Sequence, residues 1–192
     1  MLHLLNVSFS YGKKSVIENL SLSLARGEIL AVMGESGCGK STLLNLIAGL
    51  RKPNDGIIEN NAASISYVFQ EPRLFPWLTV EQNLRAVIPT QENADEKIAQ
   101  ALKTVGLSDS AKLYPSELSG GMKIRASLAR ALVFGGDLFL LDEPFSALNE
   151  ELRAELATAM RKELKARNAS AVLVTHQRAD AELMADRIVR LL

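Results

Sequence analysis

The segment GESGCGKS, Gly34 to Ser41, is the part of the sequence whose residue types most clearly predict chemistry. It fits G-x-x-x-x-G-K-[ST], follows an apolar run and precedes a helical pattern, which is the setting of a phosphate-binding loop. Its glycines permit backbone angles that other residues resist, and they let amides approach phosphate oxygens at a helix N-terminus. Lys40 is placed to reach the β- and γ-phosphates, and the Ser41 hydroxyl to ligate Mg²⁺. The segment predicts nucleotide binding without distinguishing a kinase, a GTPase or a motor.

A second group of candidate catalytic side chains ends the apolar segment LFLLDEP, Leu138 to Pro144. Asp142 is well placed to hold Mg²⁺ through water, as in other phosphate-loop proteins. Glu143 follows directly, and a carboxylate beside a γ-phosphate polarises an attacking water molecule. The alternative interpretation is an acidic strand end followed by a turn, which the presence of the phosphate loop makes weaker.

The segment ELSGGMKIR, Glu117 to Arg125, predicts a second site for an anion. Ser119 is a favourable helix N-cap, and two glycines follow it. A serine hydroxyl and bare amides at the start of a helix attract negative charge. A tight turn with a cap would explain LSGG alone. Because Ser119 lies 23 residues before Asp142, we interpret it together with the other phosphate-binding segments.

The periodicity of the apolar residues predicts the strands and helices that position these segments. Strands are expected at residues 2–9, 16–24, 28–33, 65–69, 138–141, 171–175 and 187–191, with a turn at 11–14. Helices are expected at residues 40–50, 79–88, 94–105, 119–134, 150–166 and 178–184.

The order of these elements predicts an α/β fold. Apolar strands alternate with helices in the second half of the chain, which favours a mainly parallel core sheet covered on both faces. The first two strands and their turn indicate an N-terminal antiparallel β subdomain. We expect a single domain, in which residues 1–71 and 135–192 form a nucleotide-binding core and residues 72–134 form an inserted helical subdomain.

The composition is that of an ordinary globular protein. The 192 residues include 22 basic and 22 acidic side chains, so the formal net charge is zero and gives no indication of nucleic-acid binding. No apolar run approaches the roughly 20 residues that span a bilayer, and the N-terminus lacks the features of a leader peptide. We expect the protein to stay in the cytosol, so a role at a membrane requires a partner. The single cysteine, Cys38, excludes an intrachain disulfide.

Taken in order along the chain, the motifs resemble those of the ATP-binding cassette (ABC) family of ATPases, and the resemblance covers nearly the whole chain. GESGCGKS is similar to the Walker A motif, Gln70 to the Q-loop, LSGGM to the signature motif and LFLLDEP to Walker B. SALN at residues 146–149 resembles the D-loop, and His176 in VTHQ resembles the switch histidine. Tyr11 lies where the family stacks an aromatic ring on adenine. The resemblance implies a P-loop NTPase fold and an ATPase that uses ATP and Mg²⁺.

The resemblance also implies a head-to-tail homodimer that holds two ATP molecules between its subunits. By this resemblance Glu143 is the catalytic base, His176 contacts the γ-phosphate, and Gln70 senses Mg²⁺ and the attacking water. The implied metal site consists of Ser41, Gln70 and Asp142. The residues implied to contact ATP are Tyr11, Gly34, Glu35, Ser36, Gly37, Cys38, Gly39, Lys40, Ser41 and Thr42 of one copy, and Ser119, Gly120 and Gly121 of the other.

Two positions depart from the commonest pattern of the family. Met122 replaces the usual glutamine after LSGG, and Asn149 replaces the usual aspartate of the D-loop. Asn149 keeps the hydrogen-bonding shape of aspartate but loses its charge. It also precedes Glu150 and Glu151 at a predicted helix start, where it is a favourable N-cap.

The resemblance implies an energy-coupling subunit of a membrane transporter. ATP closes the dimer, hydrolysis opens it, and the motion passes to separate integral membrane permease subunits at the cytoplasmic face of the membrane. A separate ATPase subunit is typical of importers, which also use a solute-binding protein, although some exporters share the arrangement. The alternatives are an export-type cassette and a soluble ABC ATPase such as an assembly factor. A small-molecule kinase would leave LSGGM and Gln70 unexplained.

The segment QEPRLFPWLTVEQNL, Gln70 to Leu84, brings Phe75, Pro76 and Trp77 to the start of the predicted helical subdomain. In the resembling family, the cassette receives the coupling helix of the membrane subunit here. The three residues are interpreted either as partner contacts or as core anchors under the following helices. The letters EPRLFPWLTVEQNL resemble the corresponding segment of the nitrate, sulfonate and taurine importer branch.

Overall fold

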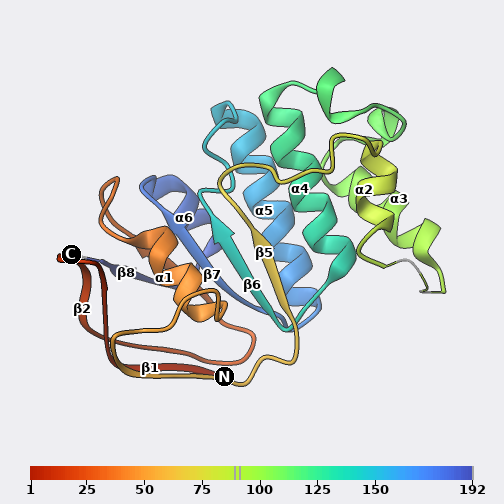
Figure 1. Ribbon diagram of the computed structural model, residues 1–192. Coiled ribbons are helices and arrows are strands. Elements are labelled where there is room, and N and C mark those ends of the chain that lie inside the picture. The colour runs from red at the N-terminus through yellow and green to blue at the C-terminus, as the bar shows by residue number, and fades with distance from the viewer. Residues whose placement is uncertain (89, 91, 192) are drawn as a thin grey trace.

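Two β-sheets form the frame of the molecule in the computed structural model, which describes residues 1–88, 90 and 92–191 (Figure 1). The larger sheet contains β3 (Ile29–Met33), β5 (Ile65–Val68), β6 (Leu138–Asp142), β7 (Ser170–Thr175) and β8 (Arg187–Arg190). These strands lie in the order β5–β6–β7–β3–β8, and every neighbouring pair is parallel. The predicted α/β fold with a mainly parallel core sheet is therefore confirmed.

The parallel sheet is buried on both faces, because its alternate residues belong to two different hydrophobic cores. In β6, Phe139 and Leu141 pack with a core that includes buried helical residues such as Leu84, Leu128 and Met160. Leu138 and Leu140 of the same strand pack with the core under the N-terminal strands. Strands buried on both faces are continuous apolar runs, which explains why LFLL has no polar alternation.

The smaller sheet is antiparallel and consists of β1 (Leu2–Tyr11), β2 (Lys14–Leu24) and β4 (Asp55–Asn60) in the order β2–β1–β4. The tight turn between β1 and β2 contains Gly12 at φ 61°, which a residue with a side chain rarely adopts. The sequence predicted the hairpin but missed β4. Its residues DGIIEN alternate only between exposed and partly buried, so the apolar pattern is weak.

The α-helices are α1 (Lys40–Ile47), α2 (Val80–Arg85), α3 (Ala94–Thr104), α4 (Gly120–Phe134), α5 (Glu150–Ala166) and α6 (Arg178–Met184), and Ser108–Ser110 and Pro115–Glu117 form short 3₁₀ turns. Figure 1 shows α1 near the small sheet, whereas α2, α3 and α4 gather at the far side of the molecule. Among the described residues, none of the helices is both long enough and apolar enough to cross a bilayer.

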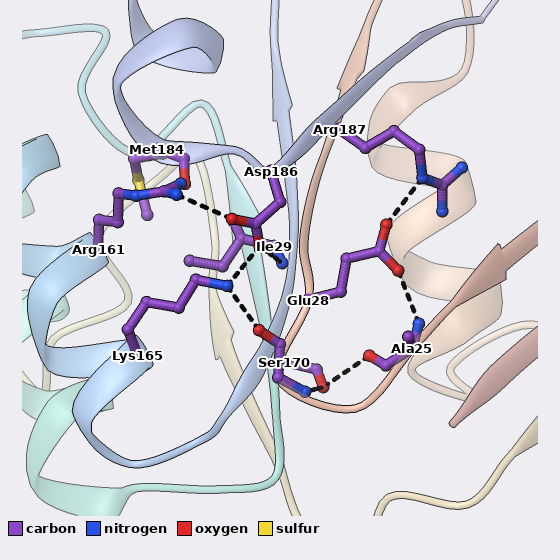
Figure 2. A network of polar contacts seen from close by, with 10 residues as sticks. Ala25, Glu28, Ile29, Arg161, Lys165, Ser170, Met184, Asp186 and Arg187 are labelled. Atoms are coloured by element: carbon purple, nitrogen blue, oxygen red, sulfur yellow. Dashed lines mark hydrogen bonds and ion pairs between the residues drawn. The ribbon is translucent and has the colours of Figure 1, made fainter.

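Hydrogen bonds and ion pairs around Asp186 connect the start of β3 to α5 (Figure 2). The carboxylate accepts hydrogen bonds from the Ile29 amide at 2.8 Å, from Arg161 at 2.8 Å and from Lys165 at 2.5 Å. Burial raises the pKa of Asp186, but these hydrogen bonds outweigh burial and hold the pKa below its usual value. The network lies at the end of β3 opposite to the phosphate loop, so it stabilises the sheet without entering the candidate site.

We predict that Asp186→Asn lowers the free energy of unfolding at pH 7 by about 2 kcal/mol, because hydrogen bonds to charged groups contribute about 1.5–3 kcal/mol each. The folded pKa lies below the ordinary 3.8, so the stabilisation is complete above that pH and is lost as pH falls through the folded pKa. Urea unfolding over a pH series should show the difference from the parent protein shrinking in acid.

The exposed carboxylate of Asp109 provides the control for this experiment. Asp109→Asn should change the free energy of unfolding by less than about 0.5 kcal/mol at every pH, as is usual for surface substitutions. A deficit of Asp186→Asn that stays constant from neutral to acid pH would contradict the role given to its charge.

Candidate active site

The phosphate loop connects β3 to α1, as the sequence predicted, and its backbone uses conformations that glycine favours. Gly37 and Gly39 have φ of 83° and 102°. A Cβ atom at Gly39 would also lie 2.7 Å from Cγ1 of Val16, so a side chain would collide with β2. The ammonium of Lys40 donates to the carbonyl oxygens of Gly34 and Glu35, both at 2.9 Å. The loop therefore curls around the lysine that sequence analysis expected to bind phosphates.

Glu143 lies between Lys40 and His176. Its Oε1 is 3.6 Å from the Lys40 ammonium, and its Oε2 is 2.8 Å from Nδ1 of His176. The residue is buried and has φ of 48°, a left-handed conformation that costs energy in a residue with a side chain. A hydrogen bond of 3.0 Å from its amide to the carbonyl oxygen of Val174 holds this conformation. Residues predicted from three separate motifs thus meet at one carboxylate.

Asp142 and Ser41 form the part of the site that fits a divalent cation. Asp142 is buried, and its Oδ1 has no hydrogen-bond partner among the residues that the structure describes. Burial and the adjacent charge of Glu143 raise the pKa of Asp142, while a hydrogen bond with Ser41 and the charge of Lys40 lower it. A bound Mg²⁺ favours oxygen ligands of this type. An unpartnered buried oxygen beside a serine hydroxyl therefore suits the predicted metal site.

Tyr11 lies beside the start of α1. Its hydroxyl is 3.4 Å from Oγ1 of Thr42, and the guanidinium of Arg51 lies 4.7 Å from the centre of its ring. The ring also meets Phe9 edge to face, with centroids 4.9 Å apart. Tyr11 remains substantially exposed, so the ring is available next to the phosphate loop, where the sequence expected an adenine contact.

Gln70 follows β5 and has an exposed side chain. Among the described residues, no hydrogen bond or ion pair connects it to Asp142 or Glu143. Aromatic stacking fixes the backbone next to it instead: the ring of Phe69 stacks on Tyr67 at 3.9 Å, and the guanidinium of Arg73 lies 3.7 Å from the Phe69 ring. Gln70 therefore follows the strand that pairs with β6, where Val68 lies opposite Leu141, but its side chain lies outside the network of Glu143.

The serine of the signature segment caps α4, because the Ser119 hydroxyl accepts a hydrogen bond from the amide of Met122 at 3.2 Å. A Cβ atom at Gly121 would lie 3.2 Å from Leu148, so the segment packs closely against residues 147–148. Figure 1 shows the first turn of α4 and the phosphate loop before α1 in separate parts of the molecule. Within one chain, the two predicted anion sites are therefore not brought together.

Phe75 and Trp77 protrude from the turn that precedes α2. Their exposed fractions are 41% and 70%, and their rings lie 5.7 Å apart. Their interpretation as core anchors is therefore wrong, and Pro76 between them is exposed as well. The buried side chain of Asn83 holds the turn, since it bonds both the amide and the carbonyl of Phe75 and two further carbonyls. Sequence analysis missed Asn83 because a buried amide has no distinct local pattern.

Comparison with known proteins identifies the family. The family described as "ABC transporter" matches residues 17–146, from β2 to the segment after β6. The chain belongs to the ABC transporter family. An aliphatic sulfonates import ATP-binding protein, SsuB, of Bacillus subtilis is 44% identical over 172 residues, which are 85% of this chain and 68% of that protein. The aliphatic sulfonates import ATP-binding protein SsuB 1 of Pseudomonas aeruginosa is 40% identical over 202 residues, and the match covers 98% of this chain and 81% of that protein.

Solved structures of ABC cassettes share the fold over the full chain. The dimeric structure of a bacterial ABC transporter cassette superposes with a TM-score of 0.91 at 29% identity, and covers 100% of this chain and 94% of that one. The dimeric structure of a post-hydrolysis state bound to ADP and phosphate has a TM-score of 0.90 at 29% identity, with the same coverage. The chain is therefore an ATP-binding ATPase with the cassette fold.

We predict that Lys40→Ala lowers the affinity for ATP by about tenfold or more, because a charged hydrogen bond to phosphate contributes about 1.5–3 kcal/mol. Titration with a fluorescent ATP analogue would measure the change. The exposed Lys112 provides a matched control, and Lys112→Ala should leave the affinity within about twofold. Equal affinities for the parent protein and Lys40→Ala would contradict the assignment of the phosphate loop.

Proposed function

We propose that the chain is the ATP-hydrolysing subunit of an importer and that it works as a head-to-tail homodimer. The observation that carries the proposal is the separation of two anion sites within one chain. Lys40 and Glu143 lie at one site, and the first turn of α4 with Ser119 lies at another. Each ATP molecule can contact both only if a second copy supplies the second site.

The proposed reaction is attack of water on the γ-phosphate of ATP. Glu143 is the general base, since its buried carboxylate can accept a proton from water held beside the phosphate. His176 stays close to that carboxylate and contacts the γ-phosphate, and Lys40 exchanges the loop carbonyls for phosphate oxygens. Ser41, Gln70 and Asp142 are proposed to hold Mg²⁺, which supplies charge neutralisation at the phosphates when it is bound.

Further ATP contacts are proposed at both half-sites. Tyr11 stacks on adenine, and the amides of the loop before α1 surround the phosphates. The contacting residues of the loop and of α1 are Gly34, Glu35, Ser36, Gly37, Cys38, Gly39 and Thr42. The partner copy adds Ser119, Gly120 and Gly121, whose exposed helix start attracts the γ-phosphate.

The names of the relatives favour import of an organic sulfonate, since they are described as aliphatic sulfonates import ATP-binding proteins. The proposed complex contains integral membrane permease subunits and a solute-binding protein, and the chain lies peripherally at the cytoplasmic face of the membrane. Residues 72–134 would form the helical subdomain that receives the permease, and residues 1–71 and 135–192 the nucleotide-binding core. The alternative functions are those of an export-type cassette and of a soluble assembly factor. The names of the relatives describe import and therefore favour neither alternative.

The proposed base can be tested with Glu143→Gln, which keeps the shape of the side chain and removes its basicity. We predict that this variant binds ATP, loses hydrolysis by about 100-fold or more and accumulates as an ATP-bound dimer. Phosphate release and size-exclusion chromatography with ATP measure the two effects. The exposed Glu59 of β4 is the control site, and Glu59→Gln should hydrolyse ATP normally. Rapid hydrolysis by Glu143→Gln would refute the role of this residue.

The proposed docking of a permease can be tested at Trp77, which lies between β5 and α2 and is 70% exposed. Affinity purification of the tagged chain from solubilised native membranes should recover an integral membrane protein. Trp77→Ala should reduce that recovery by about tenfold, as expected for a central interface aromatic, and leave basal ATPase activity unchanged.

The exposed Leu50 provides the control for docking, because it follows α1 and is 61% exposed. Leu50→Ala should recover as much membrane protein as the parent chain. Recovery of no integral membrane protein by the parent chain would favour the assembly-factor alternative, and a Trp77→Ala variant that fails to fold would contradict the surface role of the tryptophan.

A further inference from the structure

Arg153, in the first turn of α5, contacts three segments that meet beside the candidate active site. Its guanidinium donates to the carbonyl oxygen of Leu148 at 3.1 Å and to the side-chain oxygen of Gln177. Its Nε lies 3.7 Å from Oδ1 of Asp180, which belongs to the first turn of α6. The side chains of Arg153 and Asp180 are only 16% and 2% exposed. One nearly buried cation therefore links the segment before α5 to the turn that follows His176.

That turn is held from the inside as well. The hydroxyl of Thr175 accepts a hydrogen bond from the Gln177 amide at 3.0 Å and donates one to Oδ2 of Asp180 at 3.4 Å. His176 stands between these anchored residues, and its side chain is 49% exposed. Packing therefore restrains the imidazole only partly, and its distance to Glu143 depends on the backbone that carries it.

We propose that Arg153 is a positioning residue for ATP hydrolysis, which acts through Gln177 to hold His176 at Glu143. The guanidinium also bonds the carbonyl of Leu148, and residues 147–148 pack against the start of α4. Arg153 thus links the switch histidine to the surface that the proposed dimer presents to its second copy. The inference rests on the proposed function, because its effect on the rate passes through His176 and Glu143.

Arg153 makes two side-chain contacts whose removal should have different effects, an ion pair with Asp180 and a hydrogen bond with Gln177. The ion pair with Asp180 is a stability contact, since loss of Arg153 would leave a buried carboxylate without its cation. The hydrogen bond between Arg153 and Gln177 holds the turn that carries His176. Removing the Gln177 side chain breaks this hydrogen bond and keeps the ion pair between Arg153 and Asp180. Gln177→Ala is therefore the variant that separates positioning from folding, and Arg153→Gln affects both.

The experiment measures kcat, the KM for ATP and the melting temperature of the full chain. Gln177→Ala should lower kcat by about tenfold, since small displacements of a reacting group have effects of this size or larger, with KM within about twofold of the parent protein. Arg153→Gln should lower kcat to the same extent and also lower the melting temperature. In the double variant kcat should be no lower than in Arg153→Gln, because both changes break one link.

Arg161 on the same helix provides the matched control. Arg161 likewise donates to a carbonyl, that of Met184, and to a carboxylate, that of Asp186. This carboxylate accepts a hydrogen bond from the Ile29 amide at the start of β3, so the contacts lie away from His176. Arg161→Gln should lower the melting temperature and leave kcat within about twofold. The same tenfold loss of kcat in this variant would mean that lost stability, not positioning, explains the result.

Three further outcomes overturn the inference. A normal kcat in Gln177→Ala excludes the link, and effects that multiply in the double variant exclude a shared path. If His176→Ala hydrolyses ATP at the parent rate, the proposed function of His176 fails and the inference fails with it. If His176→Ala is inactive while Gln177→Ala is normal, only the inference fails.

Discussion

The carboxylate of Glu143 is the group on which the arrangement of the site depends. It lies 3.6 Å from the Lys40 ammonium and 2.8 Å from the His176 ring, and these residues follow three different strands of the parallel sheet. The carboxyl ends of parallel strands meet at one edge, so the order β6–β7–β3 brings the three side chains together. A buried carboxylate needs compensating partners, and the sheet order supplies a cation and an imidazole from separate motifs.

The same geometry explains why the backbone at this position is strained. β6 must end at Asp142 so that its carboxylate reaches Ser41, while the next side chain must point to Lys40. The left-handed conformation of Glu143 reconciles these requirements, and the bond from its amide to Val174 anchors it to β7. Strain of this kind persists only where the surroundings enforce it, which is common at functional sites.

Much of this fold could be predicted from the sequence, because strands and helices follow local periodicity. The ends of α5 were predicted to the residue, α6 was predicted near its observed position, and the phosphate loop was placed between β3 and α1. The strand β4 was missed, since half of its side chains are exposed and its apolar residues show no clear alternation. The contacts of Arg153 with Gln177 and Asp180 join residues more than twenty positions apart, so they depend on how α5 packs on α6.

Asn149 shows how a departure from the family pattern can leave local structure intact. Its side-chain oxygen accepts a hydrogen bond from the Leu152 amide at 3.0 Å and thereby caps α5. An aspartate would make the same cap, so the loss of charge does not remove the contact that starts the helix. Glu150 and Glu151 still place negative charge in the first turn, where it interacts favourably with the partial positive charge of the helix N-terminus. The orientation of Arg153 therefore follows from the cap and the backbone of α5, and it does not require a charge at residue 149.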